Sequence, residues 1–395
     1  MEFPRIYLAA DNCFASKRWT IPSSWMSIIK DGGIRYIEAS ADNECDPLYS
    51  DSEYIRDWLR DVQKNSERLG LEIANLYSGH GTYSTLGLAH TDVRYRDHFL
   101  TKWVYALIDN AAYLGANVGF FCHAFDETVL QNPELYRQYQ ADLLDRFEKI
   151  ADYAAKKQVI PCVEQMYSPH QYPWRVSDCY DVLKSMSLPF YITIDVGHQF
   201  GQKRFLRPTA EKLLQAIEEK TPIYAGPYRA FQKQYEAIRG KISAKLAIEE
   251  ILEDCENYGY LFAEEKDSDV YYWLRKLGCY SPIIHLQQTD NTASQHHDFT
   301  HENNKTGLIS GEKVLKSIYE SYLQPQKDDM PPRAKEIFLT LELFYGTAEY
   351  NHDIINRYIE SAAYWRKFIP EDGLRLDRLI SLLEDGYCPD TQKVI

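Results

Sequence analysis

The chain has 395 residues, a net charge of −14 at pH 7 and a hydrophobic fraction of 45%. This composition is typical of a globular protein with a large core, and its acidity disfavours nucleic acid as a partner because phosphate backbones would be repelled. No basic N-terminal region precedes a long apolar stretch, and no run reaches the ~20 apolar residues of a membrane span. The eight cysteines form no CxxC pair, so we expect reduced thiols, a cytoplasmic location and no membrane partner.

Short apolar runs alternate with longer amphipathic stretches along almost the whole chain. We expect buried strands at Ile6–Asp11, Tyr36–Ala41, Glu72–Ser78, Val118–His123, Pro161–Met166, Tyr191–Asp195, Pro282–Gln287 and Ile337–Leu343. We expect helices between them, for example at Glu53–Leu69, Phe99–Leu114, Leu135–Lys156 and Gly311–Leu323. Gly70 and Gly115 stand where the first two of these helices should end, and Gly278 stands where the helix before strand seven should end.

Eight strands that alternate with helices predict a parallel sheet that closes on itself. The expected fold is therefore a single (β/α)8 TIM barrel over residues 1–395, of the α/β class. A doubly wound open sheet is the alternative, and the absence of a GxGxxG motif after the first strand weakens it.

One segment interrupts the alternation between strands six and seven. Residues 201–266 are far more than a barrel usually places there, and they contain a helical pattern of their own at Ala244–Glu256. We interpret this segment as an insertion over the C-terminal mouth of the barrel, which acts as a lid, a specificity element or an oligomer contact. A helical tail is expected at Asp377–Asp385.

Polar side chains recur at the expected carboxyl ends of the strands, where barrel enzymes place their chemistry. In chain order these positions carry Glu38, His80, His123, Glu164, Asp195 with His198, His285 with Gln287 and Asp290, and Glu342.

Three of these carboxylates stand inside apolar strands. Burying Glu164, Asp195 or Glu342 is costly unless the carboxylate is paired or bound to a cation. A Lys or Arg partner inside the barrel would satisfy each one alone, but together with His285 they form a plausible metal site on four consecutive strands. Oxygen and imidazole ligands suit Mn²⁺, Co²⁺, Mg²⁺ or Zn²⁺.

The remaining histidines carry less information. His80 and His123 fit a structural role as well as a pocket role. His296 and His297 stand in a polar loop, where we expect solvated side chains.

This order of residues resembles the xylose isomerase-like barrel superfamily, which includes ketose epimerases, sugar-phosphate isomerases and endonuclease IV. The resemblance rests on Glu164, the Asp195-x-x-His198 motif, the pair His285 and Asp290, and Glu342, and it runs from the first strand to the last. It implies one divalent metal, Mn²⁺ first, on Glu164, Asp195, His285 and Glu342. Glu164 and Glu342 would also be the catalytic acid–base pair, and His198 would touch a substrate oxygen.

We therefore expect a metal-dependent isomerase or epimerase of a ketose or ketose phosphate. A metal acidifies the C–H beside a carbonyl, one glutamate removes that proton to give an ene-diolate, and a returned proton completes epimerisation or isomerisation. Further substrate contacts are expected from His80, His123, Trp174, Gln287, Asp290 and His301.

Three alternatives stay open. A lyase, such as a keto-inositol dehydratase or a 3-keto-glycoside cleaving enzyme, would use the same ligands. An endonuclease IV-like zinc phosphodiesterase would also use His80, His123 and His301, but Phe299 replaces the Asp expected two residues before His301. A non-catalytic sugar-binding protein is the third. Four basic residues stand near strand ends and could bind a phosphate, so a phosphorylated substrate stays open: Lys17, Arg18, Lys203 and Arg204. The sequence does not decide whether the protein forms a homo-oligomer.

Overall fold

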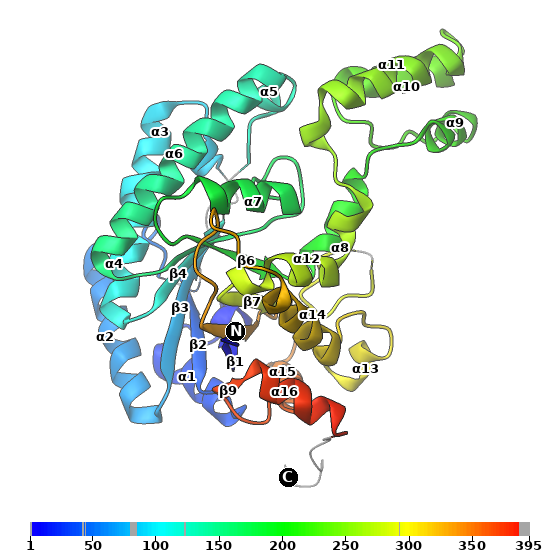
Figure 1. Ribbon diagram of the computed structural model, residues 1–395. Helices are drawn as coiled ribbons and strands as arrows, with labels where there is room; N and C mark the ends of the chain where they lie inside the picture. Colours follow the sequence, from blue (N-terminus) through cyan, green and yellow to red (C-terminus); the bar gives the residue numbers. More distant parts are fainter. Residues whose placement is uncertain are drawn as a thin grey trace.

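A computed structural model gives the structure of the protein and describes residues 2–41, 43, 45–79, 85–121, 124–291 and 293–386. Eight parallel strands within these ranges close into a barrel, because β1 pairs with both β2 and β8 (Figure 1). The strands are β1 Arg5–Asp11, β2 Tyr36–Ser40, β3 Glu72–Ser78, β4 Asn117–Phe121, β5 Pro161–Glu164, β6 Tyr191–Asp195, β7 Ile283–Leu286 and β8 Glu336–Leu341. The expected TIM barrel is confirmed, and the open sheet is excluded.

Helices surround the barrel, and short ones occupy the segments after β4, β6 and β7 (Figure 1). They are α1 Pro22–Asp31, α2 Ser52–Leu69, α3 Val93–Phe99, α4 Tyr105–Leu114, α5 Glu127–Leu130, α6 Pro133–Lys157, α7 Val176–Ser185, α8 His198–Gln202, α12 Val270–Leu277, α13 His301–Asn304, α14 Gly311–Leu323 and α15 Asn351–Arg366. Gly70 and Gly115 end α2 and α4 in the left-handed conformation, with φ of 68° and 67°. Both stop signals are thus confirmed, for the reason that glycine adopts this conformation without a Cβ penalty.

Apolar side chains from different strands fill the barrel interior toward the amino ends of the strands. Ala9, Cys162, Tyr191, Ile283 and Phe338 form one buried cluster, with Tyr7, Tyr36 and Ala74 packed against it. The rings of Tyr7 and Phe338 stack with centroids 4.8 Å apart. Since this layer is a packed core, polar groups can gather only at the opposite, carboxyl end of the strands.

The segment between β6 and β7 contains three additional helices, α9 Ala210–Glu218, α10 Tyr228–Ile238 and α11 Ala244–Asn257. In Figure 1 they project to one side of the barrel, at the upper right. Tyr258 and Tyr260 attach this arm to the loop after β4, since their hydroxyls donate to the carbonyls of Gln131 and Leu130 at 3.1 and 2.7 Å. The insertion thus lies beside the carboxyl ends of the strands.

The chain ends with a short strand and a helix. Strand β9, Leu374–Arg375, pairs antiparallel with β1, and α16 spans Leu376–Glu384, one residue earlier at each end than expected. Of the described residues, six are cysteines, and all six are buried and free of disulfides. None of the helices in the described ranges is long and apolar enough to cross a membrane.

Candidate metal centre and active site

The carboxyl ends of four neighbouring strands bring the expected ligands together. Glu164 and Asp195 are the last residues of β5 and β6, His285 lies in β7 in register with Asp195, and Glu342 directly follows β8. The N–H of Glu342 still donates to the carbonyl of Leu286 at 3.1 Å, so the strand pairing extends to it. One ligand atom from each of the four residues lies within 4.8 Å of every other.

These four residues, called the strand group below, are buried together. Their exposed fractions are 2% for Glu164, 0% for Asp195, 0% for His285 and 5% for Glu342. Three carboxylates at this spacing and burial repel one another and have lost water, so they need a cation between them. Glu342 Oε2 accepts no well-aligned hydrogen bond from the described residues, and the ring nitrogens of His285 and His296 lie 3.3 Å from it. The donor set of hard oxygens and one imidazole fits a divalent metal.

His285 faces carboxylates on both sides of its ring. Nδ1 lies 3.0 Å from Glu164 Oε1 and 3.3 Å from Glu342 Oε2, while Nε2 lies 2.8 Å from Glu38 Oε1. Burial lowers the pKa of His285, but the charges of Glu38, Glu342 and Glu164 outweigh burial and hold it well above its usual value. A proton on Nδ1 and a metal on Nδ1 therefore compete for the same nitrogen, whereas the proton on Nε2 can stay beside Glu38.

Glu38 lies behind the strand group rather than in it. It is fully buried on β2, and Asn75 Nδ2 donates to its Oε2 at 2.5 Å. In metal sites, a carboxylate behind a histidine fixes the orientation of the ring. Glu38 is placed to do this for His285. The pattern of polar residues at strand ends includes Glu38 but predicts no role for it.

Asp195 is held in place by the loops after β6 and β7. Gln287 Nε2 lies 2.8 Å from each of its carboxylate oxygens, and the N–H of Gly197 donates to Oδ1 at 2.6 Å. A Cβ on Gly197 would lie 2.3 Å from Gln287 Cδ, so this close approach requires glycine. Gln287, expected to contact substrate, is fully buried and does not line the cavity.

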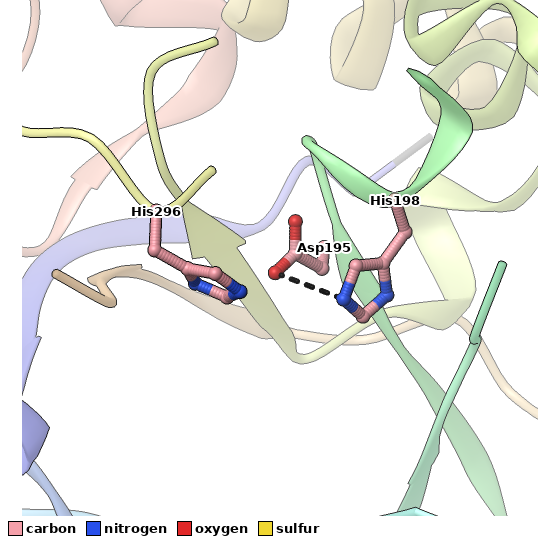
Figure 2. Close-up of side chains that lie close together, drawn as sticks. All are labelled: Asp195, His198 and His296. Carbon is pink, nitrogen blue, oxygen red and sulfur yellow. Dashed lines mark ion pairs between the residues drawn. The ribbon is translucent and has the colours of Figure 1, made fainter. Parts of the chain in front are cut away.

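Two histidines flank Asp195, as Figure 2 shows. The Nδ1 of His198 lies 2.7 Å from the backbone carbonyl of Gln165, which can only accept, so Nδ1 carries the proton. Its Nε2 points toward Asp195 Oδ2 at 3.6 Å. Asp195, His198 and His296 form a second group whose ligand atoms could hold a metal, and it shares Asp195 with the first.

The expectation of a solvated His296 is wrong. Its Nδ1 lies 3.3 Å from Glu342 Oε2, and its ring packs edge-on against Phe344 at 4.8 Å. Burial lowers its pKa, but the charges of Glu342, Asp195 and Glu164 raise it to about 9. The loop after β7 doubles back at an antiparallel bridge between Gln288 and His297, which turns His296 inward. No spacing in the sequence signals that bridge.

A cavity of about 580 Å³ opens above the strand group. It is lined by Asp11, Cys13, Ser16, Lys17, Ser40, Tyr77, Phe121, Glu164, Met166, Tyr167, His198, Ser294, His296, Glu342, Phe344, Tyr345 and Thr347. Among the described residues, none from 201–266 lines it. Glu164 faces the cavity with one oxygen held by the hydroxyl of Tyr77 and the other by His285. Both proposed acid–base glutamates thus reach the same space.

Trp174, Asp290 and His301, also expected to contact substrate, do not line the cavity. Trp174 is fully buried, with its ring 5.9 Å from that of Phe205, and does not line the cavity. Asp290 and His301 are exposed, and the backbone N–H of His301 donates to Glu360. His80 and His123 lie outside the described residues.

Comparisons with known proteins agree with this architecture. Residues 26–232, just over half of the chain, match the model of a family described as xylose isomerase-like TIM barrel. A D-erythrulose 1-phosphate 3-epimerase from Brucella abortus (strain 2308) is 29% identical over 318 residues, which cover 80% of this chain and 81% of the relative.

Solved structures share the fold at low sequence identity. A putative xylose isomerase from Rhodospirillum rubrum ATCC 11170 superposes with a TM-score of 0.64 at 16% identity, over 91% of this chain and 98% of that one. An L-ribulose 3-epimerase gives a TM-score of 0.56 at 14% identity, over 98% and 99% of the two chains.

Proposed function

The chain belongs to the xylose isomerase-like TIM barrel family, and from that premise we propose a divalent-metal-dependent isomerase or epimerase of a ketose or ketose phosphate. Its likeness to a sugar-phosphate epimerase along four fifths of its length supports an enzyme of this type. The observation that carries the proposal is the strand group: three buried carboxylates and one imidazole within 4.8 Å, beneath a cavity in the size range of small-molecule sites.

The strand group fits a divalent cation, with Mn²⁺ as the first choice and Co²⁺, Mg²⁺ or Zn²⁺ as alternatives. Glu164, Asp195, His285 and Glu342 would hold it. When bound, such an ion supplies Lewis-acid polarisation of a substrate carbonyl, which acidifies the neighbouring C–H.

Proton transfer falls to the two glutamates that line the cavity. One of Glu164 and Glu342 removes the proton from the carbon beside the carbonyl and leaves an ene-diolate. Return of a proton to the opposite face of that carbon inverts it, and return to the neighbouring carbon moves the carbonyl. Tyr77 holds Glu164 in a fixed orientation for this step, and His198 Nε2 is available to a substrate oxygen.

The test is deuterium exchange at the substrate C–H. The metal-loaded protein is incubated in D₂O with a panel of ketoses and ketose phosphates, and incorporation and products are followed by NMR. We expect exchange with epimer or isomer formation, and a ~10²–10⁴-fold loss in Glu164→Gln and Glu342→Gln. The exposed Glu371→Gln is the matched control.

Each other outcome has a distinct meaning. Exchange in either glutamine variant at the native rate refutes the acid–base assignment. Release of water or of a leaving group from the substrate indicates the lyase. A metal-loaded protein that exchanges no C–H in any sugar of the panel contradicts the proposed enzyme and favours a sugar-binding protein.

A further inference from the structure

The cavity above the strand group is strongly asymmetric in charge. Its acidic residues are Asp11, Glu164 and Glu342. Of the described Lys and Arg residues only Lys17 lines it, and the positive charge of His296 is offset by Glu342, whose Oε2 lies 3.3 Å from the ring. Lys17 follows β1 in the loop at the carboxyl end of the barrel and is exposed. Hydroxyl groups of Ser16 and Thr347 line the same cavity.

Among the described residues, the Lys17 side chain has no hydrogen-bond or ion-pair partner, in contrast to Arg18 and Lys203; Arg204 has none either, but it does not line the cavity. Arg18 donates to the backbone carbonyls of Gly346 and Glu349 at 2.5 and 3.2 Å, and Lys203 donates to the side chain of Asn291. Lys17 makes no ion pair with any residue in the described ranges, although the cavity that it lines contains three carboxylates. Its ammonium group therefore stays available to a ligand.

The backbone holds Lys17 in a fixed place. Its φ is 63°, a left-handed conformation that is uncommon for residues with a side chain. The amides of Arg18 and Trp19 donate to the carbonyl of Ala15 at 3.0 and 2.9 Å, which closes the turn around it. Arg18 then ties this turn to the loop after β8 that carries Thr347.

We propose that Lys17, with the hydroxyls of Ser16 and Thr347, receives the phosphate of a phosphorylated ketose. This inference rests on the proposed function and narrows its substrate class. A phosphate monoester is close to a dianion near neutral pH, so the acidic residues repel it and the single ammonium attracts it. Its charge therefore orients the substrate, with the phosphate at Lys17 and the carbonyl end toward the strand group.

The test compares phosphorylated and free sugars of one carbon skeleton. For erythrulose and D-xylulose, the kcat/KM of C–H exchange is measured with and without the terminal phosphate in the metal-loaded protein. We expect the native protein to prefer the phosphates, and Lys17→Met to lower the phosphate-to-free ratio about tenfold or more. Lys17→Arg should restore part of the ratio, and Lys203→Met, a cation outside the cavity, should keep it.

A ratio near one in the native protein, or the same ratio in Lys17→Met, would overturn the phosphate site and leave the proposed function standing. If the native protein exchanges no ketose or ketose phosphate of the full panel, the proposed function fails, and calorimetry with glycerol 3-phosphate as the probe decides the site independently. Binding that weakens about tenfold in Lys17→Met supports it, and equal or absent binding in both proteins refutes it.

Discussion

Two groups of polar side chains meet at the carboxyl end of the barrel, and the chain holds them differently. The strand group is fixed by backbone pairing, which continues from β6 through β7 to Glu342. The loop group, Asp290, His296 and His301, belongs to the segment after β7, and only His296 reaches the cavity. The register of paired strands determines which side chains lie next to each other. The neighbours of a loop side chain depend instead on how the loop folds back.

The largest expected effect tests the strand group directly. Asp195→Ala removes a buried ligand, so we expect the metal content to fall from about one equivalent to near zero. Elemental analysis by inductively coupled plasma mass spectrometry measures it. Asp290→Ala, an acid of the loop group, should retain the metal. Equal metal loss in both variants would show that the strand group does not bind the metal differently from the loop group. Three zinc ions per native chain would favour phosphodiester chemistry.

A smaller effect on metal binding is expected from Glu38, which lies behind the strand group. Glu38→Gln keeps the shape of the side chain but removes the charge that faces His285 Nε2, so we expect metal affinity to fall about 10–100-fold. Competitive titration with a chelator gives the dissociation constant. Glu336→Gln, at the opposite end of the barrel, is the control. Unchanged affinity in Glu38→Gln would show that His285 needs no orienting carboxylate.

In the loop after β7, two adjacent histidines allow a direct comparison of their effects on turnover. His296→Gln removes the ring that lies beside Glu342, and we expect kcat/KM to fall about tenfold while the metal stays bound. His297→Gln changes the exposed neighbour on the same loop and should leave turnover as it is. Equal rates of C–H exchange in the two variants would refute a role for His296 in turnover.

The smallest effect concerns the junction between the groups. Gly197→Ala places a methyl group against Gln287, which links Asp195 to the loop that carries His296, and overpacking of this kind costs about 1–3 kcal/mol. Urea denaturation measures the loss in free energy of unfolding. Gly346→Ala meets only the Glu349 side chain, at 3.4 Å to Oε1 and 3.8 Å to Cγ, and serves as the control. Native stability in Gly197→Ala would mean that Gln287 moves aside without cost.

The strand-borne part of the molecule could be predicted because its signals are local. A carboxylate inside an apolar run, as at Glu164 and Glu342, implies both a strand and a buried cation. The placement of Trp174, Gln287 and His296 could not be predicted in this way. Gln287 lies only two residues beyond His285, yet it turns to Asp195 and the loop instead of to the cavity, because long-range contacts decide the direction.

The pairing of β1 with β8 has a consequence for how the protein matures. During synthesis, a nascent chain that has emerged through β7 already carries Glu164, Asp195 and His285, but it lacks Glu342 and the strand that closes the barrel. Asp11 and Lys17, made first, meet the loop after β8 only at the end. Metal loading and barrel closure are therefore expected to coincide late, so that no partial chain holds a competent site.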